Sequence, residues 1–425
     1  MNDAPQSAST DTSEPQGSGA PMPLWEFIAL AASLMALNAL AIDIMLPALG
    51  LIQDDFGFTN DNDRQLVIII YLMSFGASQL VFGPLTDRFG RRRVLMITLL
   101  LYVIAGLACV FVPTYGSLLA ARVLQGIGAG ATRVVSTSIV RDLYSGRLMA
   151  KIMSMVMMVL MAAPMVAPAI GQGVLLVFGE WRAVFWSLAI YGGIVMVWSY
   201  VRLPETLPAS ARKAIDLKNM LAAYKEILSH RIVCGYVLAS GFIYGGLFSY
   251  IASTEQIFSD IYDAGLAFPI YIGAAALVMS LANMVNSRLV MSWGMRKLSH
   301  TAMIGFTCIS LLHALTSTLG VTQFAVFYTF VLTSFFCLGF IGANFSAIAM
   351  QPLGALAGTA AAVLGFATTS FAGAIGWILG QTYDGTTAPV FFGHALLGAS
   401  AIVSVLFVER GRLFQTAEAP AGDFK

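Results

Sequence analysis

Apolar windows of about 20 residues recur along the whole chain, separated by short polar segments. A helix of that length can cross the hydrocarbon core of a bilayer. The pattern therefore predicts an all-α polytopic membrane protein with twelve transmembrane helices in two six-helix bundles. The predicted helices are, in order, Leu24–Pro47, Gln65–Gly83, Val94–Val112, Ser117–Val140, Ile152–Val177, Ala183–Val201, Val233–Ala252, Leu266–Asn286, Thr301–Leu319, Thr322–Ala349, Thr359–Gly380 and Val390–Phe407.

The longest polar stretch between helices, Arg202–Ile232, separates the first six windows from the last six. It contains the amphipathic segment Leu217–Leu228, which is typical of a linker at a membrane surface. Both ends of the chain have the mixed small and polar composition of disordered tails, and no basic segment followed by an apolar run predicts a signal peptide. The predicted domains are an N-terminal tail (1–23), a six-helix bundle (24–201), a linker (202–232), a second six-helix bundle (233–408) and a C-terminal tail (409–425).

The basic residues gather in alternate polar segments, which indicates how the chain is oriented. With both termini in the cytoplasm, all but four of the 23 Lys and Arg residues fall in cytoplasmic segments, as the positive-inside rule requires. Of the four, Arg64 and Arg182 fall outside, and Arg122 and Arg133 fall within the fourth helix. We expect a multi-pass protein of the bacterial inner membrane with cytoplasmic termini and linker.

The composition excludes several classes of protein. Only 11% of the residues are charged, against about 25% in soluble globular proteins. A net charge of +1 gives no basic field for nucleic acid. The sequence has neither paired His or Cys spacings nor the G-x-x-x-x-G-K-[ST] phosphate loop. We therefore expect no metal, no cofactor, no nucleotide energy source and no enzymatic activity.

The loop after the second predicted helix reads GPLTDRFGRR over residues 83–92. Its glycines favour a tight turn, and the Asp87 carboxylate can meet an arginine or a helix N-terminus. The run resembles the loop signature of the major facilitator superfamily at every position. In that family the loop is taken to latch the two halves in the outward-facing state. The resemblance implies a conformational latch made of Gly83, Asp87, Arg88, Gly90, Arg91 and Arg92.

Two further runs resemble motifs of the same superfamily. RVLQGIGA, at residues 122–129, resembles the fourth-helix motif associated with proton coupling. APMVAPAIGQ, at residues 163–172, resembles the fifth-helix antiporter motif, with Ala167 and Gln172 in place of two glycines. These substitutions weaken the inference of antiport from this motif alone. The resemblance assigns the kink of that helix to Pro164, Pro168 and Gly171.

Shorter stretches narrow the resemblance to the bicyclomycin-resistance (Bcr/CflA) group of drug exporters. They are DIMLPAL at 43–49, WRAVFW at 181–186 and LPET at 203–206. The resemblance extends over nearly all of Leu24 to Phe407. The loop at residues 286–297 is similar to a degenerate copy of the first-half loop signature, as expected if the two halves are duplicated.

Few ionisable residues fall within the predicted spans, where they usually line a cavity or pair. Asp43 and Arg122 lie at similar depths in helices one and four, and we expect them to pair, with Asp43 as the proton carrier. Arg133 lies eleven residues after Arg122, on nearly the same helix face. It is a candidate for a direct role in proton coupling or in substrate binding, but it lies near enough to the cytoplasmic end to snorkel. Glu255, at the outer end of helix seven, is expected to be solvated, with a transport role as the alternative.

These residues and the resemblance together predict a proton-coupled antiporter that exports small amphipathic drugs by rocker-switch alternating access. Its partners would be the substrate, protons and the bilayer, and we expect a monomer. An apolar substrate cavity is predicted to include Tyr244, Phe248, Tyr328 and Glu255. Two alternatives stay open: an exporter of amino acids or sugars on the same scaffold, and a membrane receptor or scaffold that transports nothing.

Overall fold

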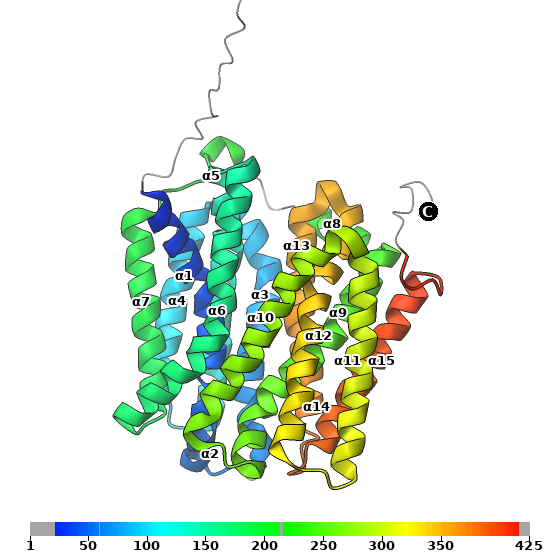
Figure 1. Ribbon diagram of the computed structural model, residues 1–425. Helices are drawn as coiled ribbons and strands as arrows, with labels where there is room; N and C mark the ends of the chain where they lie inside the picture. Colours follow the sequence, from blue (N-terminus) through cyan, green and yellow to red (C-terminus); the bar gives the residue numbers. More distant parts are fainter. Residues whose placement is uncertain (1–21, 59, 213–215, 416–425) are drawn as a thin grey trace, which may run out of the picture.

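The computed structural model describes residues 22–58, 60–212 and 216–415, and its helices run side by side in one bundle (Figure 1). Helix α1 begins and helix α15 ends at the same end of the bundle, which we call the terminal end. The opposite end, where α2 lies, is called the far end. Most of the two predicted tails, residues 1–21 and 416–425, lies outside the described residues.

Within its described residues, the first half forms seven α-helices and two short 3₁₀ segments. They are α1 (Leu24–Asp43), η1 (Leu46–Ala48), α2 (Leu49–Phe56), η2 (Asp61–Gln65), α3 (Leu66–Phe89), α4 (Arg91–Phe111), α5 (Tyr115–Leu143), α6 (Gly146–Phe178) and α7 (Arg182–Arg202). The predicted first helix does not end at Pro47, because η1 and α2 continue it to Phe56. Proline is tolerated there because the first turn of a helical segment needs no N–H donor.

The linker region contains η3 (Ala209–Ala211) and α8 (Leu217–Ser229), and α8 lies at the terminal end beside α13 (Figure 1). The second half follows as α9 (Arg231–Gln256), η4 (Ile257–Ile261), η5 (Gly265–Ala267), α10 (Phe268–Trp293), α11 (Met295–Thr318), α12 (Phe324–Met350), η6 (Gln351–Leu356), α13 (Ala357–Phe366), η7 (Ala367–Phe371), α14 (Ala372–Gly380) and α15 (Ala388–Val408). The predicted eleventh helix is thus interrupted by a π-helical turn, η7. Such turns are frequent at functional sites.

Eleven helical stretches in the described part of the chain are long and apolar enough to cross a membrane. This confirms an all-α polytopic membrane fold. The predicted fourth helix, α5, is not among the eleven, because its arginines and its many small residues lower its hydropathy. It nevertheless packs along α3 and α4 inside the first half.

Glycines allow α5 to approach its neighbours closely. A Cβ atom placed on Gly128 would lie 2.6 Å from the backbone nitrogen of Tyr102 in α4, and one on Gly126 would lie 2.5 Å from the carbonyl oxygen of Tyr71 in α3. Small residues are the usual means by which membrane helices pack, because lipid gives no hydrophobic drive for association. The close approach fixes α5, and the arginines on it, against the other helices.

We expect Gly128→Ala to lower the stability of the protein by about 1–3 kcal/mol, because the added methyl group must push two backbones apart. Thermal unfolding of the purified protein in detergent measures the effect. Gly193→Ala is the matched control, because Gly193 has no atom within 4 Å of an added Cβ. Equal melting temperatures for the two variants would contradict the packing argument.

The two halves meet where α3 contacts α13, η7 and α14, where α6 contacts α10, and at the far end, where α9 contacts α2 and η2. Corresponding turns in the halves share an unusual backbone. Gly90 precedes α4 with φ 97° and ψ 150°, and Gly294 precedes α11 with φ 78° and ψ 152°. An L-residue rarely adopts these angles. The same conformation before equivalent helices supports the interpretation of the 286–297 loop as a degenerate second copy.

Candidate functional site

The loop between α3 and α4 is organised around Arg91, whose side chain is buried. Its guanidinium forms ion pairs with Asp87 and, at 3.2 Å, with Asp142 at the end of α5. Its backbone N–H donates to Glu205 Oε1 at 2.8 Å. A Cβ atom on Gly90 would lie 2.2 Å from Glu205 Oε2, so this turn requires glycine for space as well as for its positive φ.

The other basic residues of the loop point elsewhere. Arg92 donates to the carbonyl oxygen of Tyr200 at 2.6 Å and lies over its ring, and Arg88 lies over Phe89. Gly83 has no close neighbour at its Cβ position. The bonds recorded for Asp87 in the described residues all stay within the first half. The predicted latch between halves is therefore not engaged through Asp87 in this conformation, and its role stays a prediction.

The proline motif of α6 lies where helices of both halves meet. A Cβ atom on Gly171 would lie 2.2 Å from the carbonyl oxygen of Ile44, just after α1. From the other half, the Cβ position of Gly273 in α10 lies 2.9 Å from the carbonyl oxygen of Met165. Pro164 and Pro168 are inside α6, where each removes one intrahelical hydrogen bond. The weakened segment of α6 is thus the part that contacts both α1 and α10.

Arg122 is completely buried and connects α5 to two other helices. Its Nε donates to the carbonyl oxygen of Val67 in α3 at 2.9 Å, and its Nη2 donates to that of Ala41 in α1 at 3.1 Å. Its Nη1 donates to Gln125 at 2.8 Å, and its guanidinium lies 4.3 Å from the ring centroid of Tyr71. Carbonyl dipoles and an aromatic face therefore stabilise this cation.

Asp43 is the last residue of α1, and only 7% of its surface is exposed. The predicted ion pair with Arg122 is not formed. Arg122 instead donates to the carbonyl oxygen of Ala41, two residues before Asp43, and its other nitrogens donate to the carbonyl oxygen of Val67 and to the amide oxygen of Gln125. No ion pair or hydrogen bond of the Asp43 carboxylate is recorded within the described part of the chain. A buried carboxylate without a cation can exist in hydrocarbon only at a high cost or in its neutral form.

Arg133 has an exposed side chain, although it belongs to the interior helix α5. It is near enough to Tyr244 of α9, in the other half, to interact electrostatically. In the described residues it has no carboxylate partner. The exposure of Arg133 and its interaction with Tyr244 indicate that the side chain is directed toward the second half.

Hydrogen bonds close the far end of the interface between the halves. Gln65 Nε2 donates to Gln256 Oε1 at 2.6 Å and to the carbonyl oxygen of Gly380 at 3.1 Å. Gln256 donates to Asn62 Oδ1 at 2.8 Å, and Asn62 donates to the carbonyl oxygen of Tyr383 at 2.9 Å. Gln65 and Gln256 are completely buried. Amide pairs of this kind give no periodic signal in a sequence, which is why sequence reasoning missed them.

An ion cluster continues this far-end closure. Arg64 pairs with Glu255 at 3.0 Å and with Asp260 at 3.1 Å. The expectation that Glu255 is solvated is wrong: 9% of its surface is exposed, because Arg64 of the other half covers it. We call the whole set the far-end cluster, defined as Asn62, Arg64, Gln65, Glu255, Gln256, Asp260, Gly380 and Tyr383.

The four residues predicted to line the substrate cavity do not lie together. Tyr244 and Phe248 are neighbours on α9, with ring centroids 6.4 Å apart, and the Tyr244 hydroxyl reaches the Cβ position of Gly342 in α12. Tyr328 lies 14 residues before Gly342 on α12, about 21 Å along the helix axis. It packs in an aromatic cluster and donates to the carbonyl oxygen of Tyr271 at 2.8 Å. Of the four, Tyr244 is near enough to Arg133 to interact with it electrostatically.

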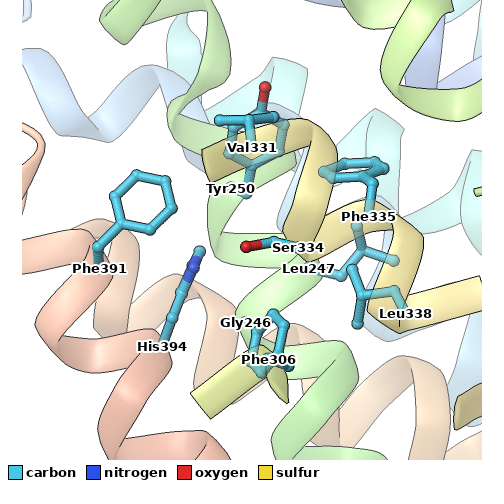
Figure 2. A pocket seen from close by; sticks show the side chains of 10 residues that line it. All are labelled: Gly246, Leu247, Tyr250, Phe306, Val331, Ser334, Phe335, Leu338, Phe391 and His394. Carbon is cyan, nitrogen blue, oxygen red and sulfur yellow. The ribbon is translucent and has the colours of Figure 1, made fainter. Parts of the chain in front are cut away.

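A small cavity lies inside the second half, lined by residues of α9, α11, α12 and α15 (Figure 2). Phe306, Phe391 and His394 lie on one side of it, and Leu247 and Ser334 on another. It leaves about 10 Å³ for the centre of a water-sized sphere, which is room for about one water molecule. Pockets for drug-sized molecules measure about 300–1,000 Å³, so this cavity is not a substrate site.

The terminal end of the second half has a polar cluster that resembles the one around Arg91. Arg296, near the start of α11, pairs with Glu409 at 2.7 Å. Tyr236 donates to the same Glu409 oxygen at 2.8 Å and contacts His300 Nε2 at 2.9 Å. Sequence reasoning noticed Arg296 as part of a degenerate loop signature but did not identify its partners, which come from distant helices.

Comparison with known proteins places these features in context. The family model described as Major Facilitator Superfamily matches residues 31–380. The chain is 31% identical over 385 residues to the uncharacterized MFS-type transporter YdgK of Bacillus subtilis (strain 168), covering 88% of this chain and 93% of that protein. It is 27% identical over 385 residues to the bicyclomycin resistance protein homolog of Haemophilus influenzae, covering 89% and 94%.

Other comparisons cover a part of the chain or the fold alone. The multidrug resistance protein MdtL of Escherichia coli O81 (strain ED1a) is 33% identical over 186 residues, which cover 43% of this chain and 46% of that protein. The crystal structure of a D-xylose-proton symporter has a TM-score of 0.74 at 14% identity, covering 93% of this chain and 100% of that one. The partially occluded, inward-open xylose transporter XylE from E. coli has a TM-score of 0.70 at 15% identity, covering 91% and 99%.

Proposed function

This chain belongs to the Major Facilitator Superfamily, and from that membership we propose that it is a proton-coupled exporter of small amphipathic compounds such as antibiotics. The names of its Haemophilus and E. coli relatives, which refer to bicyclomycin and multidrug resistance, support the substrate class. The observation that carries the proton coupling is Asp43, a buried carboxylate in the first span with no cationic partner in the described residues. Such a group is suited to taking and releasing a proton.

The positive-inside distribution supports placing the terminal end in the cytoplasm. In this orientation we count α5 as a further span, which brings the total to twelve, because it runs the full depth of the first half between α4 and α6. The far-end cluster then seals the periplasmic side, while the exposed side chain of Arg133 is directed toward the second half. We infer that this conformation is closed to the outside, and that substrate enters from the cytoplasm or the inner leaflet.

The proposed cycle is rocker-switch alternating access. A substrate binds between the halves, the far-end cluster opens while the terminal end closes, and a proton from outside reaches Asp43 as substrate leaves. One proton crossing 100 mV supplies about 2.3 kcal/mol. That energy supports about a fiftyfold gradient of a neutral solute, which is sufficient for resistance to a drug.

Transport in proteoliposomes under an imposed pH gradient tests this function. A panel of amphipathic antibiotics, amino acids and sugars is loaded, and substrate accumulation is followed together with internal pH. We expect antibiotic accumulation that collapses when the gradient is dissipated. Accumulation of amino acids or sugars alone would reassign the substrate, and a complete lack of gradient-driven transport would reject the proposal.

We expect Asp87→Asn to reduce transport severalfold while leaving the amount of folded protein nearly unchanged. Asp87 is partly exposed and its ion pair with Arg91 is local, so its loss removes little stability. Its proposed contribution is to the outward-facing state, in which the loop would contact the second half. The measurement is initial export rate per mole of purified protein, with Asp61→Asn as a control acidic residue at the far end. Wild-type rates for Asp87→Asn would refute the latch.

A further inference from the structure

Arg133 differs from Arg122 and Arg64 because it has no neutralising partner in the described residues. Arg122 is bonded to carbonyl and amide oxygens, and Arg64 pairs with Glu255. Arg133 has neither kind of partner in the described part of the chain, and its side chain is exposed. A mid-helix arginine is costly in a membrane protein and usually marks a ligand or ion pathway.

Three carboxylates at the terminal end of the bundle are already engaged. Glu26 pairs with Arg202 at 2.5 Å, Asp142 with Arg91 at 3.2 Å, and Glu409 with Arg296 at 2.7 Å. None of these three acids pairs with Arg133. The positive charge of Arg133 is therefore not cancelled by these three acids.

The surroundings of Arg133 combine this charge with apolar surface. Across the interface lie Tyr244 and, one turn further along α9, Phe248, both partly exposed. The Tyr244 hydroxyl would lie 2.2 Å from a Cβ atom placed on Gly342, so the tip of this side chain packs on α12. A guanidinium near Tyr244, with Phe248 one turn further along α9, suits a molecule that has one anionic group on an apolar body.

The unpaired charge of Arg133 affects the energy of alternating access. While the terminal end is open, water solvates Arg133 at little cost. When the terminal end closes, that water is removed, and an unpaired buried cation costs several kcal/mol. A neutral or cationic substrate would leave this penalty in place, whereas a carboxylate would form charge-assisted, bidentate hydrogen bonds with the guanidinium.

We propose that Arg133 is the substrate-recognition cation, and that the preferred substrates are amphipathic compounds carrying a carboxylate or a similar anionic group. This inference rests on the proposed export function and specifies its substrate class. The anionic group pairs with Arg133, the apolar body packs on Tyr244 and Phe248, and the bound pair permits the terminal end to close.

Three fluorescent probes with the same apolar body test the assignment: pyrenebutyrate, pyrenebutanol and pyrenebutylamine. Dissociation constants are measured with purified, detergent-solubilised protein. We expect the wild-type protein to bind the carboxylate about tenfold more tightly than the alcohol, and the amine most weakly. Arg133→Gln should weaken carboxylate binding to the level of the alcohol and leave alcohol binding unchanged, and Arg133→Lys should retain part of the preference.

Arg147→Gln, at an exposed basic position near the start of α6, is the matched control and should keep the wild-type ranking. Equal wild-type binding of carboxylate and alcohol overturns the proposal, as does an Arg133→Gln variant that weakens all three probes equally. If Arg133→Gln does not fold, the ranking in Arg133→Lys decides, because an undiminished preference would exclude guanidinium recognition. Loss of gradient-driven export with an intact carboxylate preference would reject the proposed function alone, and export without that preference would reject this inference alone.

Discussion

Substrate-dependent proton movement should fall to background in Asp43→Asn, a loss of at least about tenfold if this carboxylate is the main carrier. The amide has nearly the same shape but cannot exchange a proton. Because Asp43 has no recorded partner to lose, the fold and the melting temperature should hardly change. Counterflow of substrate, which needs no net proton transfer, should survive. The assay follows internal pH in proteoliposomes after substrate is added, alongside exchange of labelled substrate.

Glu255→Gln is the informative control for this experiment. Glu255 is the other buried carboxylate near the interface, but it pairs with Arg64. We expect this variant to loosen the far-end cluster and still to move protons. Asp43→Glu should retain part of the proton flux. If proton movement persists in Asp43→Asn and disappears in Glu255→Gln, the carrier is Glu255 and the proposed mechanism must be rebuilt around the far end.

Arg122→Ala should reduce both stability and transport, with export falling about tenfold or more if the links among α1, α3 and α5 position the site. The substitution removes donors to the carbonyl oxygens of Val67 and Ala41 and the contact with the Tyr71 ring. Charge-assisted hydrogen bonds contribute about 1.5–3 kcal/mol each, so the melting temperature should also fall. Thermal unfolding and export rate are measured on the same preparations.

Arg122→Lys separates charge from geometry. Lysine keeps the positive charge but cannot donate in the planar fork that reaches two helices at once. We expect it to recover part of the stability and less of the export rate. Full proton-coupled export by Arg122→Ala at normal expression would show that these contacts are dispensable and that Asp43 works without an organised neighbour.

The spans were predictable because hydropathy alone nearly determines them. The two exceptions have physical causes. Pro47 looks like a helix end in the sequence, but proline is acceptable in the first turn of the continuing segment η1. Helix α5 is hydrophobic enough to be recognised by eye, but its arginines and small residues, which serve packing and the interior, place it outside the apolar spans.

The candidate site was less predictable than the fold. Depth along a helix correctly suggested that Arg122 approaches α1, but depth does not determine which atom it contacts, and it binds the carbonyl oxygen of Ala41 and not Asp43. Glu255 was taken as solvated because its partner, Arg64, comes from a distant polar loop of the other half. Tyr328 was grouped with Tyr244 by residue type, although the two occupy different levels of the second half.

The far-end cluster has a consequence for proton leakage across the membrane. Most of its bonds join side-chain amides and backbone carbonyls, which do not titrate at physiological pH. In the orientation proposed above, an idle molecule presents a plug of amide hydrogen bonds and paired charges to the acidic side of the membrane. No continuous chain of water molecules then conducts protons through the resting protein. A large amount of the protein in the membrane therefore need not dissipate the proton gradient. The closure that excludes substrate from outside would therefore also block a leak of protons.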